Sequence, residues 1–346
     1  MTTQKHTNYD SREQQALLRS SIPEAIMASQ GTHFDSAEDA SVFFARELDH
    51  VKAQSYDVEY PELTALNIFP ISSEADPGAE TVTYYTYDKL GLAKVIQNYS
   101  TDLPRADVTG KPSYAQIKSL GASYGYSAQE MRASRLAGKS LDKRKGDSAR
   151  YQIDNLNNRI AWAGDAESGL MGVLSDGQNI PLFAIAAGAT SGKTSWLDKT
   201  ADEILADVNG MQKQVAKATK NVERPDMLCV PSDVYMDITT RRIPDTTMTV
   251  KTFILENAPY LKDIVPASEL DADSVDTNPY AAESGGQGVA FLFTKNANKL
   301  SLENPMPFYQ YPLQVQGLET IIPCEARTAG VIVYYPLSAL IAVGVS

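Results

Sequence analysis

The sequence predicts an α+β fold, because its strands and helices alternate without a regular strand–helix–strand rhythm. Two stretches shape this prediction. Residues 79–126 have the pattern of a long tyrosine-rich hairpin, and residues 127–164 that of a very long helix. A lone two-stranded ribbon is only marginally stable in water. We therefore expect the chain to be a subunit of a large assembly, in which neighbouring copies cover the ribbon.

Composition narrows the possible functions. The chain has 346 residues, 43% of them hydrophobic, and a net charge of -12. The hydrophobic fraction is enough for a substantial core. The net charge bears on a different question, because broad nucleic-acid-binding surfaces are usually basic. The acidic balance excludes a dedicated DNA binder and leaves a container with DNA inside. The apolar run at 337–343 is too short to span a membrane, and the N-terminus has no apolar signal core.

Histidine and cysteine limit the possible chemistry. His6, His33 and His50 are the only histidines. Residues 51–346 therefore cannot supply a Ser-His-Asp triad or a histidine metal site by themselves. We expect no catalytic, cofactor-binding or metal-ligating residues. Cys229 and Cys324 lie in apolar, strand-like surroundings and are expected to be buried free thiols.

Residues 1–75 are expected to form an N-terminal arm. Helical patterns occur at residues 11–19, 23–29 and 37–52, and an extended segment fenced by prolines follows at residues 60–71. The next domain, residues 76–126, is the predicted extended hairpin loop.

The hairpin is predicted from β-branched and aromatic residues at 81–87. We expect extended chain at 94–97, a tip at 100–112 and a return strand at 114–126. The region holds seven tyrosines, Tyr84, Tyr85, Tyr87, Tyr99, Tyr114, Tyr124 and Tyr126. Apolar rings with polar hydroxyls suit contacts that form on assembly. The alternative is an ordinary sheet inside one domain.

A capping box predicts where the long helix begins. Ser127 can accept a hydrogen bond from the Glu130 amide while the Glu130 carboxylate reaches back. The helix is expected to end at Gly164, and Gly138 and Gly146 are positions where it can bend or break. The predicted buried face consists of Ala149, Ile153, Leu156, Ile160 and Ala163. The helix also carries a basic cluster, interpreted as a solvated face or, alternatively, as lining for a DNA-facing lumen: Lys139, Lys143, Arg144, Lys145 and Arg150.

The remaining sequence alternates between short strands and helices. A second capping box, Thr200 with Glu203, predicts a helix through Lys220. A further helix is predicted at 232–241 and shorter elements at 249–255 and 258–264. Strands or extended segments are predicted at 182–187, 226–230, 289–294, 302–311, 314–323 and 325–335.

One motif resembles a phosphate-binding loop. Residues 187–194 end in Gly192-Lys-Thr and follow a strand, so Lys193 could meet a terminal phosphate and Thr194 a magnesium ion. However, alanine replaces the first glycine, and the capping box starts the helix near Thr200 instead of at the loop. We therefore disfavour a nucleotide-binding protein and keep it as an alternative.

Two further stretches, one acidic and one glycine-rich, resemble a calcium-binding loop and a dinucleotide-binding turn but lack residues that those sites require. The run from Asp271 to Asp276 has no glycine at the sixth position of a calcium loop, and Ala282 occupies the twelfth. It is expected to be a solvated acidic loop. Residues 285–288 precede a strand and not a helix, so they are expected to form a flexible loop and not a dinucleotide turn.

The order of these segments resembles the major capsid proteins of tailed bacteriophages with the Hong Kong 97-type fold. The hairpin at 79–126 precedes the long helix at 127–164, the glycine-rich turn at 169–174 and a separate domain, and strands then return. The C-terminal runs 304–312 and 323–336 also resemble one branch of these proteins. The resemblance covers residues 55–346.

The resemblance implies a spine helix at 127–164 within a peripheral domain of residues 127–182 and 301–346. It implies an apical domain at 183–300, and a shell of hexamers and pentamers in a phage head around double-stranded DNA. Expected partners are other copies of the chain, a portal, a scaffold and a cement protein. The expected location is the virion, after synthesis in a bacterial cytoplasm. Some relatives lose an N-terminal segment or form Lys–Asn crosslinks. Because the sequence begins at Met1, a cleaved segment is not expected, and no motif assigns the crosslink.

A third hypothesis is an encapsulin-like cellular compartment, which would have the same fold but hold protein cargo. DNA protected from nuclease inside isolated particles distinguishes a phage head from such a compartment.

Overall fold

The computed structural model describes residues 60–95, 105–137, 143–282 and 287–346. Residues Pro61–Ser346 form one compact unit, to which the following description applies. The helices predicted at 11–19, 23–29 and 37–52 lie outside the described residues.

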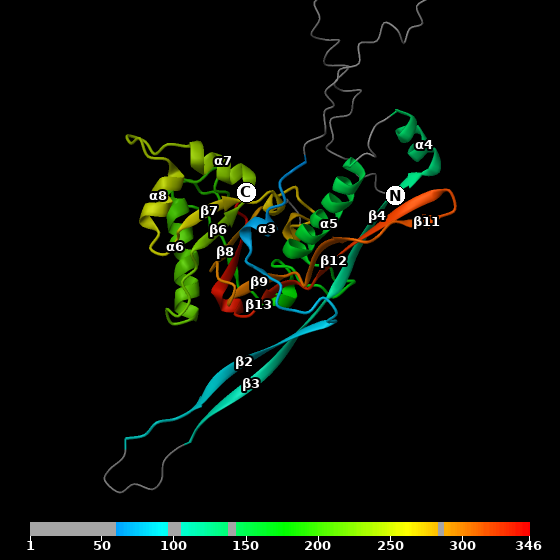
Figure 1. Cartoon of the computed structure of the whole chain (residues 1–346). Coiled ribbons are helices and arrows are strands. Elements are labelled where there is room, and N and C mark those ends of the chain that lie inside the picture. The colour runs from blue at the N-terminus through cyan, green and yellow to red at the C-terminus, as the bar shows by residue number, and fades with distance from the viewer. Residues whose placement is uncertain (1–59, 96–104, 138–142, 283–286) are drawn as a thin grey trace, which may run out of the picture. The chain divides into compact units, whose positions relative to one another are not determined.

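A five-stranded mixed sheet forms one part of the unit, in the order β5-β14-β8-β6-β7. Helices α6, α7 and α8 pack with it around a shared apolar core (Figure 1). The elements are β5 (Leu182–Ala184), α6 (Ala201–Ala218), β6 (Met227–Val230), α7 (Ser232–Thr240), α8 (Val250–Asn257), β7 (Asp263–Pro266), β8 (Val289–Phe293) and β14 (Ala339–Val343). Val208, Ile238 and Ile254 are each fully buried, one from each helix, as the helical periodicity of their apolar positions requires.

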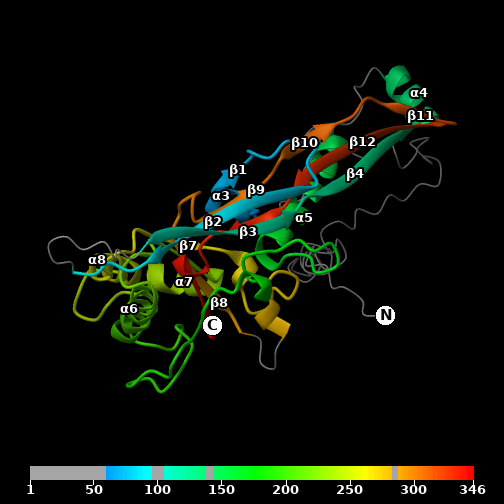
Figure 2. The same ribbon diagram turned by 90° about the horizontal axis from the view of Figure 1, so that it is seen from below.

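A second sheet is built on the long strand β12 (Glu319–Thr328), which pairs along its whole length with β4 (Lys118–Ser127). On its other edge it pairs with β10 (Met306–Gln310) and β11 (Gln314–Gln316) (Figure 2). Helix α5 (Arg144–Ala163) packs on this sheet through Ala149, Ile153 and Ile160. The predicted helical face is therefore buried at these three positions.

A third sheet joins β1 (Ile71–Ser72), β9 (Leu300–Glu303) and β13 (Gly330–Val333). The short helix α3 (Ala65–Ile68) precedes β1. Phe69 packs 4.8 Å from Trp162 of α5 and 5.8 Å from Phe293 of β8, measured between ring centroids. This aromatic cluster packs α5 against β8 of the mixed sheet.

Buried polar groups reinforce this junction. Glu269 lies in the single-turn 3₁₀ helix η3 (Ser268–Leu270) and is buried. Its carboxylate accepts hydrogen bonds from Asn158 Nδ2 at 2.5 Å and from Thr64 Oγ1 at 2.7 Å. Trp162 Nε1 donates to the same Thr64 hydroxyl at 3.2 Å. The remaining 3₁₀ helices are η2 (Asp176–Gln178), η4 (Pro279–Ala282) and η5 (Pro336–Ser338).

Both predicted capping boxes are confirmed. Ser127 N donates to Glu130 Oε2 at 3.0 Å, and Glu130 N donates to Ser127 Oγ at 3.1 Å. Thr200 and Glu203 make the equivalent pair at the start of α6. The end of the long helix is also confirmed, because Gly164 adopts a φ of 79°, which glycine tolerates best.

The long helix predicted over residues 127–164 is described as two helices. Gly138, one of the two positions where a bend or break was expected, lies outside the described residues. Helix α4 (Ala128–Ala137) and helix α5 are separate, since α5 begins at Arg144 with Lys143 as its N-cap. Gly146 does not break α5. Instead, a Cβ there would lie 3.3 Å from the Tyr124 hydroxyl, so glycine allows α5 to approach β4 closely.

Two strand boundaries also differ from prediction. A break was predicted at Pro323, but β12 continues through it, because Pro323 pairs with Ser123 of β4. On the opposite edge of β12, Pro323 lies between the residues that pair with β10 and those that pair with β11. Its missing N–H therefore breaks no row of hydrogen bonds there. The strand ends instead before Gly330, which has a φ of 71°.

The ribbon is shorter than predicted. Strand β2 (Thr81–Gly91) pairs with β3 (Ala106–Gln116), so the residues from Ala106 to Pro112 are strand and not tip. The predicted return strand at 114–126 is in fact two strands, because β4 begins at Lys118 and pairs with β12 instead of β2. Tyrosines occur on both sides of Ile117, and no turn residue such as Pro or Asn marks the position, so composition alone did not reveal the switch between sheets.

Candidate assembly surface

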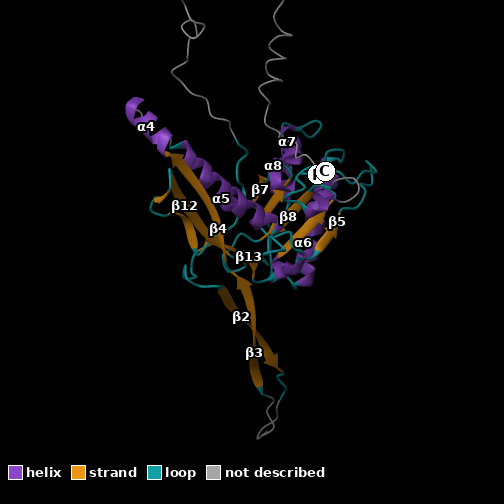
Figure 3. Ribbon diagram, turned by 90° about the vertical axis from the view of Figure 1, so that its right-hand side faces the viewer, coloured by secondary structure: helices purple, strands orange, loops and turns teal. Residues whose placement is uncertain are grey.

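The β2–β3 ribbon forms a two-stranded sheet of its own, which extends away from the other strands of the unit (Figure 3). Alternate residues point to opposite faces of a strand, and directly paired residues share a face. Tyr85 and Tyr87 are two positions apart, and Tyr114 pairs with Thr83 on the same side. The three tyrosines therefore share one face, with 60%, 72% and 67% of their surfaces exposed. We call it the tyrosine face.

The backbone opposite Tyr87 is adapted to its ring. Gly110 pairs with Tyr87, and a Cβ on Gly110 would lie only 2.9 Å from the ring carbon Cε1. Tyr85 pairs with Pro112, and the Tyr85 and Tyr87 rings are stacked with centroids 6.4 Å apart. The ribbon thus presents a layer of aromatic rings with hydroxyl groups, an arrangement suited to a protein interface.

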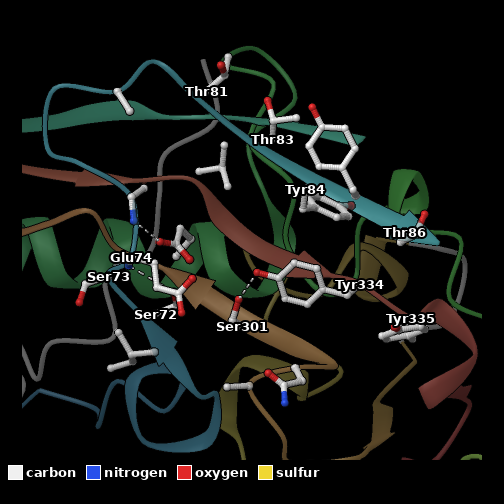
Figure 4. A pocket seen from close by; sticks show the side chains of 18 residues that line it. Ser72, Ser73, Glu74, Thr81, Thr83, Tyr84, Thr86, Ser301, Tyr334 and Tyr335 are labelled. Carbon is white, nitrogen blue, oxygen red and sulfur yellow. Dashed lines mark hydrogen bonds between the residues drawn. The ribbon is translucent and has the colours of Figure 1, made fainter. Parts of the chain in front are cut away.

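The opposite face of the ribbon anchors it to the rest of the unit. Tyr84 is half-buried and meets the Tyr334 ring edge to face, with centroids 5.0 Å apart. The Tyr334 hydroxyl lies 3.1 Å from Ser301 Oγ (Figure 4). Burial raises the pKa of Tyr334 above its usual range. Beside these contacts lies an open groove of about 800 Å³ lined by β2, β9 and the segment around Glu74.

The other predicted ribbon tyrosines have different positions. Tyr124 and Tyr126 belong to β4, where their rings meet edge to face with centroids 6.0 Å apart. Burial is the main cause that raises the pKa of Tyr124. Tyr99 lies outside the described residues. Only part of the tyrosine set thus belongs to the exposed ribbon.

The basic cluster of the long helix is partly engaged within the chain. Lys145 Nζ lies 3.1 Å from Glu130 Oε2, donates to Gly125 O at 2.9 Å, and lies 4.6 Å from the Tyr126 ring centroid. Arg150 Nε lies 3.5 Å from Asp154 Oδ2. Lys139 lies outside the described residues. These contacts support the interpretation of a solvated helix face.

The loop that resembles a phosphate site is occupied by the protein's own carboxylate. Glu203 Oε1 accepts hydrogen bonds from the Thr190 and Ser191 amides at 2.6 and 3.1 Å. Lys193 and Thr194 are exposed, and α6 begins only at Ala201. A phosphate would compete with Glu203 for the same amides, so the geometry disfavours nucleotide binding.

Asp271 of the acidic loop is bonded within the fold, and both cysteines are buried. Asp271 Oδ1 accepts a hydrogen bond from Ser232 N at 2.6 Å, and burial raises the pKa of Asp271 to about 6. Cys229 and Cys324 are buried and free, as predicted. Within the described ranges, no group of three or more His, Cys, Asp or Glu side chains could hold a metal ion. No helix among the described elements is long and apolar enough to cross a membrane.

The long sheet with its helix, the helix-covered mixed sheet and the separate ribbon define a capsid fold of the Hong Kong 97 type. The capsid of Myoviridae phage XM1 superimposes with a TM-score of 0.72 at 17% identity, covering 89% of this chain and 100% of that chain. The empty GTA particle capsid gives 0.58 at 10% identity, with coverages of 91% and 100%. Mycobacterium phage Ogopogo gives 0.57 at 12% identity, with coverages of 85% and 96%.

The sequence comparison identifies the family. The family model described as "Major capsid protein" matches residues 91–345. The chain therefore belongs to the major capsid protein family, and its function is that of a structural subunit of a capsid shell. A comparison with curated proteins finds no match.

Sequence patterns alone could not define the tyrosine face. The run from Thr81 to Tyr87 places tyrosines at both odd and even positions, so its outward face cannot be chosen from polarity. Gly110 is the one signal that was available, because a glycine in a strand often marks a close approach. It was instead assigned to the loop tip.

Proposed function

We propose that the chain assembles into hexamers and pentamers that close into the icosahedral head of a phage around double-stranded DNA. The observation that carries this proposal is the exposed tyrosine face on a ribbon that pairs with no other described strand. Exposed aromatic patches mark interaction sites, and an uncovered ribbon edge is an aggregation hazard. A neighbouring copy that covers the ribbon resolves both problems.

We propose the following assignment of residue ranges to domains. Residues 1–75 act as an arm and residues 76–126 include the hairpin loop. Residues 127–182 and 301–346 form the peripheral domain, and residues 183–300 the apical domain at the capsomer centre. Strand β14 lies within the residues proposed as peripheral, yet it pairs with β8 of the proposed apical domain in the mixed sheet. Backbone hydrogen bonds therefore link the two proposed domains.

Further parts of the proposal concern partners and location. Portal, scaffold and cement proteins are proposed partners, and DNA is held without sequence specificity on the inner face. The chain is proposed to be made in the bacterial cytoplasm, to end in the virion head, and to catalyse no reaction. The family membership and the occupied amides at Glu203 support a structural role.

Electron microscopy of the purified chain and of phage lysate tests the proposal. We expect closed particles with hexameric and pentameric capsomers, containing nuclease-protected DNA in the lysate. Small monomers under every assembly condition, together with absence of the chain from virions, would contradict it. Particles with protein cargo and no protected DNA would instead favour the cellular compartment.

A further inference from the structure

One end of the mixed sheet gathers basic side chains. Strands β6 and β7 begin at this end and β8 finishes there, because Met227 pairs with both Asp263 and Phe293. Six basic residues lie at the end of α6 and in the segments that precede β6 and β7 or follow β8: Lys217, Lys220, Arg224, Lys262, Lys295 and Lys299. We call this end of the sheet the basic end.

Most of the positive charge at the basic end has no carboxylate partner. Two of the six side chains are paired, Lys262 with Asp226 at 2.8 Å and Lys299 with Glu223 at 2.5 Å. The other four are exposed and form no ion pair with a carboxylate of the described residues. Exposed carboxylates in the last turn of α8 and at the start of β7 offset only part of this charge. The basic end is therefore net positive in a chain whose total charge is -12.

The opposite end of the mixed sheet is acidic. Strands β5, β6 and β7 finish there, and the segments that follow them carry six aspartates: Asp198, Asp202, Asp233, Asp271, Asp273 and Asp276. None of the six forms an ion pair with a described residue. Lys193, exposed in the segment after β5, offsets one of these charges. We call this end the acidic end.

The two charged ends cannot neutralise each other within one copy. The strands between them have up to five residues, and a strand rises about 3.3 Å per residue, so the ends are on the order of 15 Å apart. Between two copies, contact of a basic end with an acidic end is attractive, whereas contact of two like ends is repulsive. A contact between different surfaces of the same chain is heterologous, and repeating it closes a ring when the rotation allows.

The basic end also lies on the side of the ribbon. Lys299 Nζ lies 4.7 Å from the centroid of the Tyr335 ring. Tyr335 lines the groove at the base of the ribbon, together with Ala297 and Asn298 from the segment after β8. The C-terminus, which leaves β14 at the acidic end, lies on the side away from the ribbon (Figure 1). The copy that meets the ribbon side of the molecule therefore also approaches its basic end.

We propose that the basic end of one copy faces the acidic end of the next copy around a capsomer, so that these charges set the head-to-tail order of the ring. The inference rests on the proposed shell function, which it deepens by naming two complementary surfaces of the chain. Packaged DNA is another polyanion that a basic surface attracts. DNA would match the basic end alone and leave the acidic end unmatched, so the charge pattern favours a second copy.

A charge-exchange experiment tests the contact, with the protein concentration needed for shell assembly at low salt as the readout. Lys217→Glu with Lys220→Glu makes the basic end repel its neighbour, and we expect it to raise that concentration by roughly tenfold or more. Asp273→Lys with Asp276→Lys should have a similar effect at the acidic end. Combining all four substitutions exchanges the signs and should restore assembly to within about threefold of wild type.

Arg132→Glu with Arg135→Glu in α4 is the matched control, because these exposed arginines have the same spacing as the two lysines. Whatever its own effect, the control should not be rescued by the acidic-end substitutions. The defect of the basic-end variant should shrink at 1 M salt, where the Debye length is about 3 Å. A defect that persists at 1 M salt would contradict an electrostatic contact.

A second basic-end variant, Arg224→Glu with Lys295→Glu, keeps the test decisive if changes at the end of α6 unfold the helix. Neither residue belongs to a helix or strand. Normal assembly of a folded basic-end variant, or failure of the acidic-end substitutions to rescue it, would overturn the contact. If such particles assemble normally but retain less nuclease-protected DNA, the basic end meets DNA instead of a second copy. Failure of the wild-type chain to form any particle would overturn the shell function itself.

Discussion

The Lys199 ammonium group lies inside the protein, with 1% of its side chain exposed. Its Nζ lies 2.6 Å from Asp207 Oδ2 and donates to Ala186 O at 2.7 Å. Trp196 Nε1 donates to the same carboxylate oxygen at 3.0 Å. Removing one partner of a buried ion pair leaves an uncompensated charge, which costs far more than the intact pair contributes.

Asp207→Ala should therefore lower the free energy of unfolding by about 3–5 kcal/mol, because it leaves the buried Lys199 charge and the Trp196 N–H donor without their acceptor. Urea unfolding of the unassembled chain measures the change. Lys262→Ala is the control, since the Lys262–Asp226 pair is equally short at 2.8 Å but its lysine is 78% exposed. That control should cost less than about 1 kcal/mol. Similar losses in the two variants would contradict the assigned role of burial.

The Glu203 carboxylate at the start of α6 should make the stability of the fold depend on pH. Hydrogen bonds from the Thr200 amide, and then from the Thr190 amide, lower the pKa of Glu203 from its ordinary value of 4.5 to about 2. A carboxyl group with a depressed folded-state pKa stabilises the fold above its unfolded pKa, and this contribution is lost as pH falls through the folded value. Wild type should thus be more stable than Glu203→Gln at pH 6, with the difference shrinking between pH 4.5 and 2. Urea unfolding of both proteins across that range measures it, and a constant difference would count against the linkage.

At the scale of elements, the turn after α5 depends on a glycine. A Cβ on Gly172 would lie 2.3 Å from Gly164 N and 2.6 Å from Ile160 O, both backbone atoms that cannot move aside without opening the helix end. Gly172→Ala should lower the free energy of unfolding by about 2–3 kcal/mol through overpacking. Gly121→Ala in β4 is the control, because its nearest neighbour, Cys324 O, is 4.0 Å away. Thermal unfolding compares the two, and an unchanged melting temperature for Gly172→Ala would refute the steric argument.

Local signals predicted those features of the elements that depend on neighbouring residues. The capping boxes at Ser127 and Thr200 and the stop at Gly164 were predicted because each is completed within three or four residues. A bend or break in the long helix was expected at Gly138 or Gly146, but the start of α5 at Arg144 was not. The passage of β12 through Pro323 was not predicted either. Pro323 is accommodated by β4, a strand about 200 residues earlier in the chain, and no local pattern contains that information.

The candidate site was predictable to a similar extent. Aromatic content indicated a ribbon that needs a neighbour, and the exposure of Tyr85, Tyr87 and Tyr114 agrees with that expectation. The tyrosines that belong to β4 were misassigned, because the change of pairing partner after Gln116 depends on strand β12.

At the scale of the whole molecule, the core and the ribbon differ in what stabilises them. The aromatic cluster of Phe69, Trp162 and Phe293 belongs to a buried core that includes residues of the mixed sheet, of the β1–β9–β13 sheet and of α5. The outer part of the ribbon has strand pairing but little burial beyond Tyr84. The fold of the compact unit should therefore be independent of the outer ribbon, whereas shell assembly should depend on it.

This separation leads to a prediction for a shortened ribbon, in which Asn-Gly replaces residues 85–112. Tyr84 and Ser113 are directly paired, so a two-residue turn can join them without changing the register. The contact between Tyr84 and Tyr334 is retained. The variant should unfold at nearly the same temperature as wild type but form no closed particles, as measured by calorimetry and electron microscopy. A variant that removes burial serves as the contrast: Phe69→Ala should lower the unfolding free energy by about 3–5 kcal/mol. If the shortened ribbon unfolds the monomer, or if its shells close normally, then neighbouring copies are not what completes the ribbon.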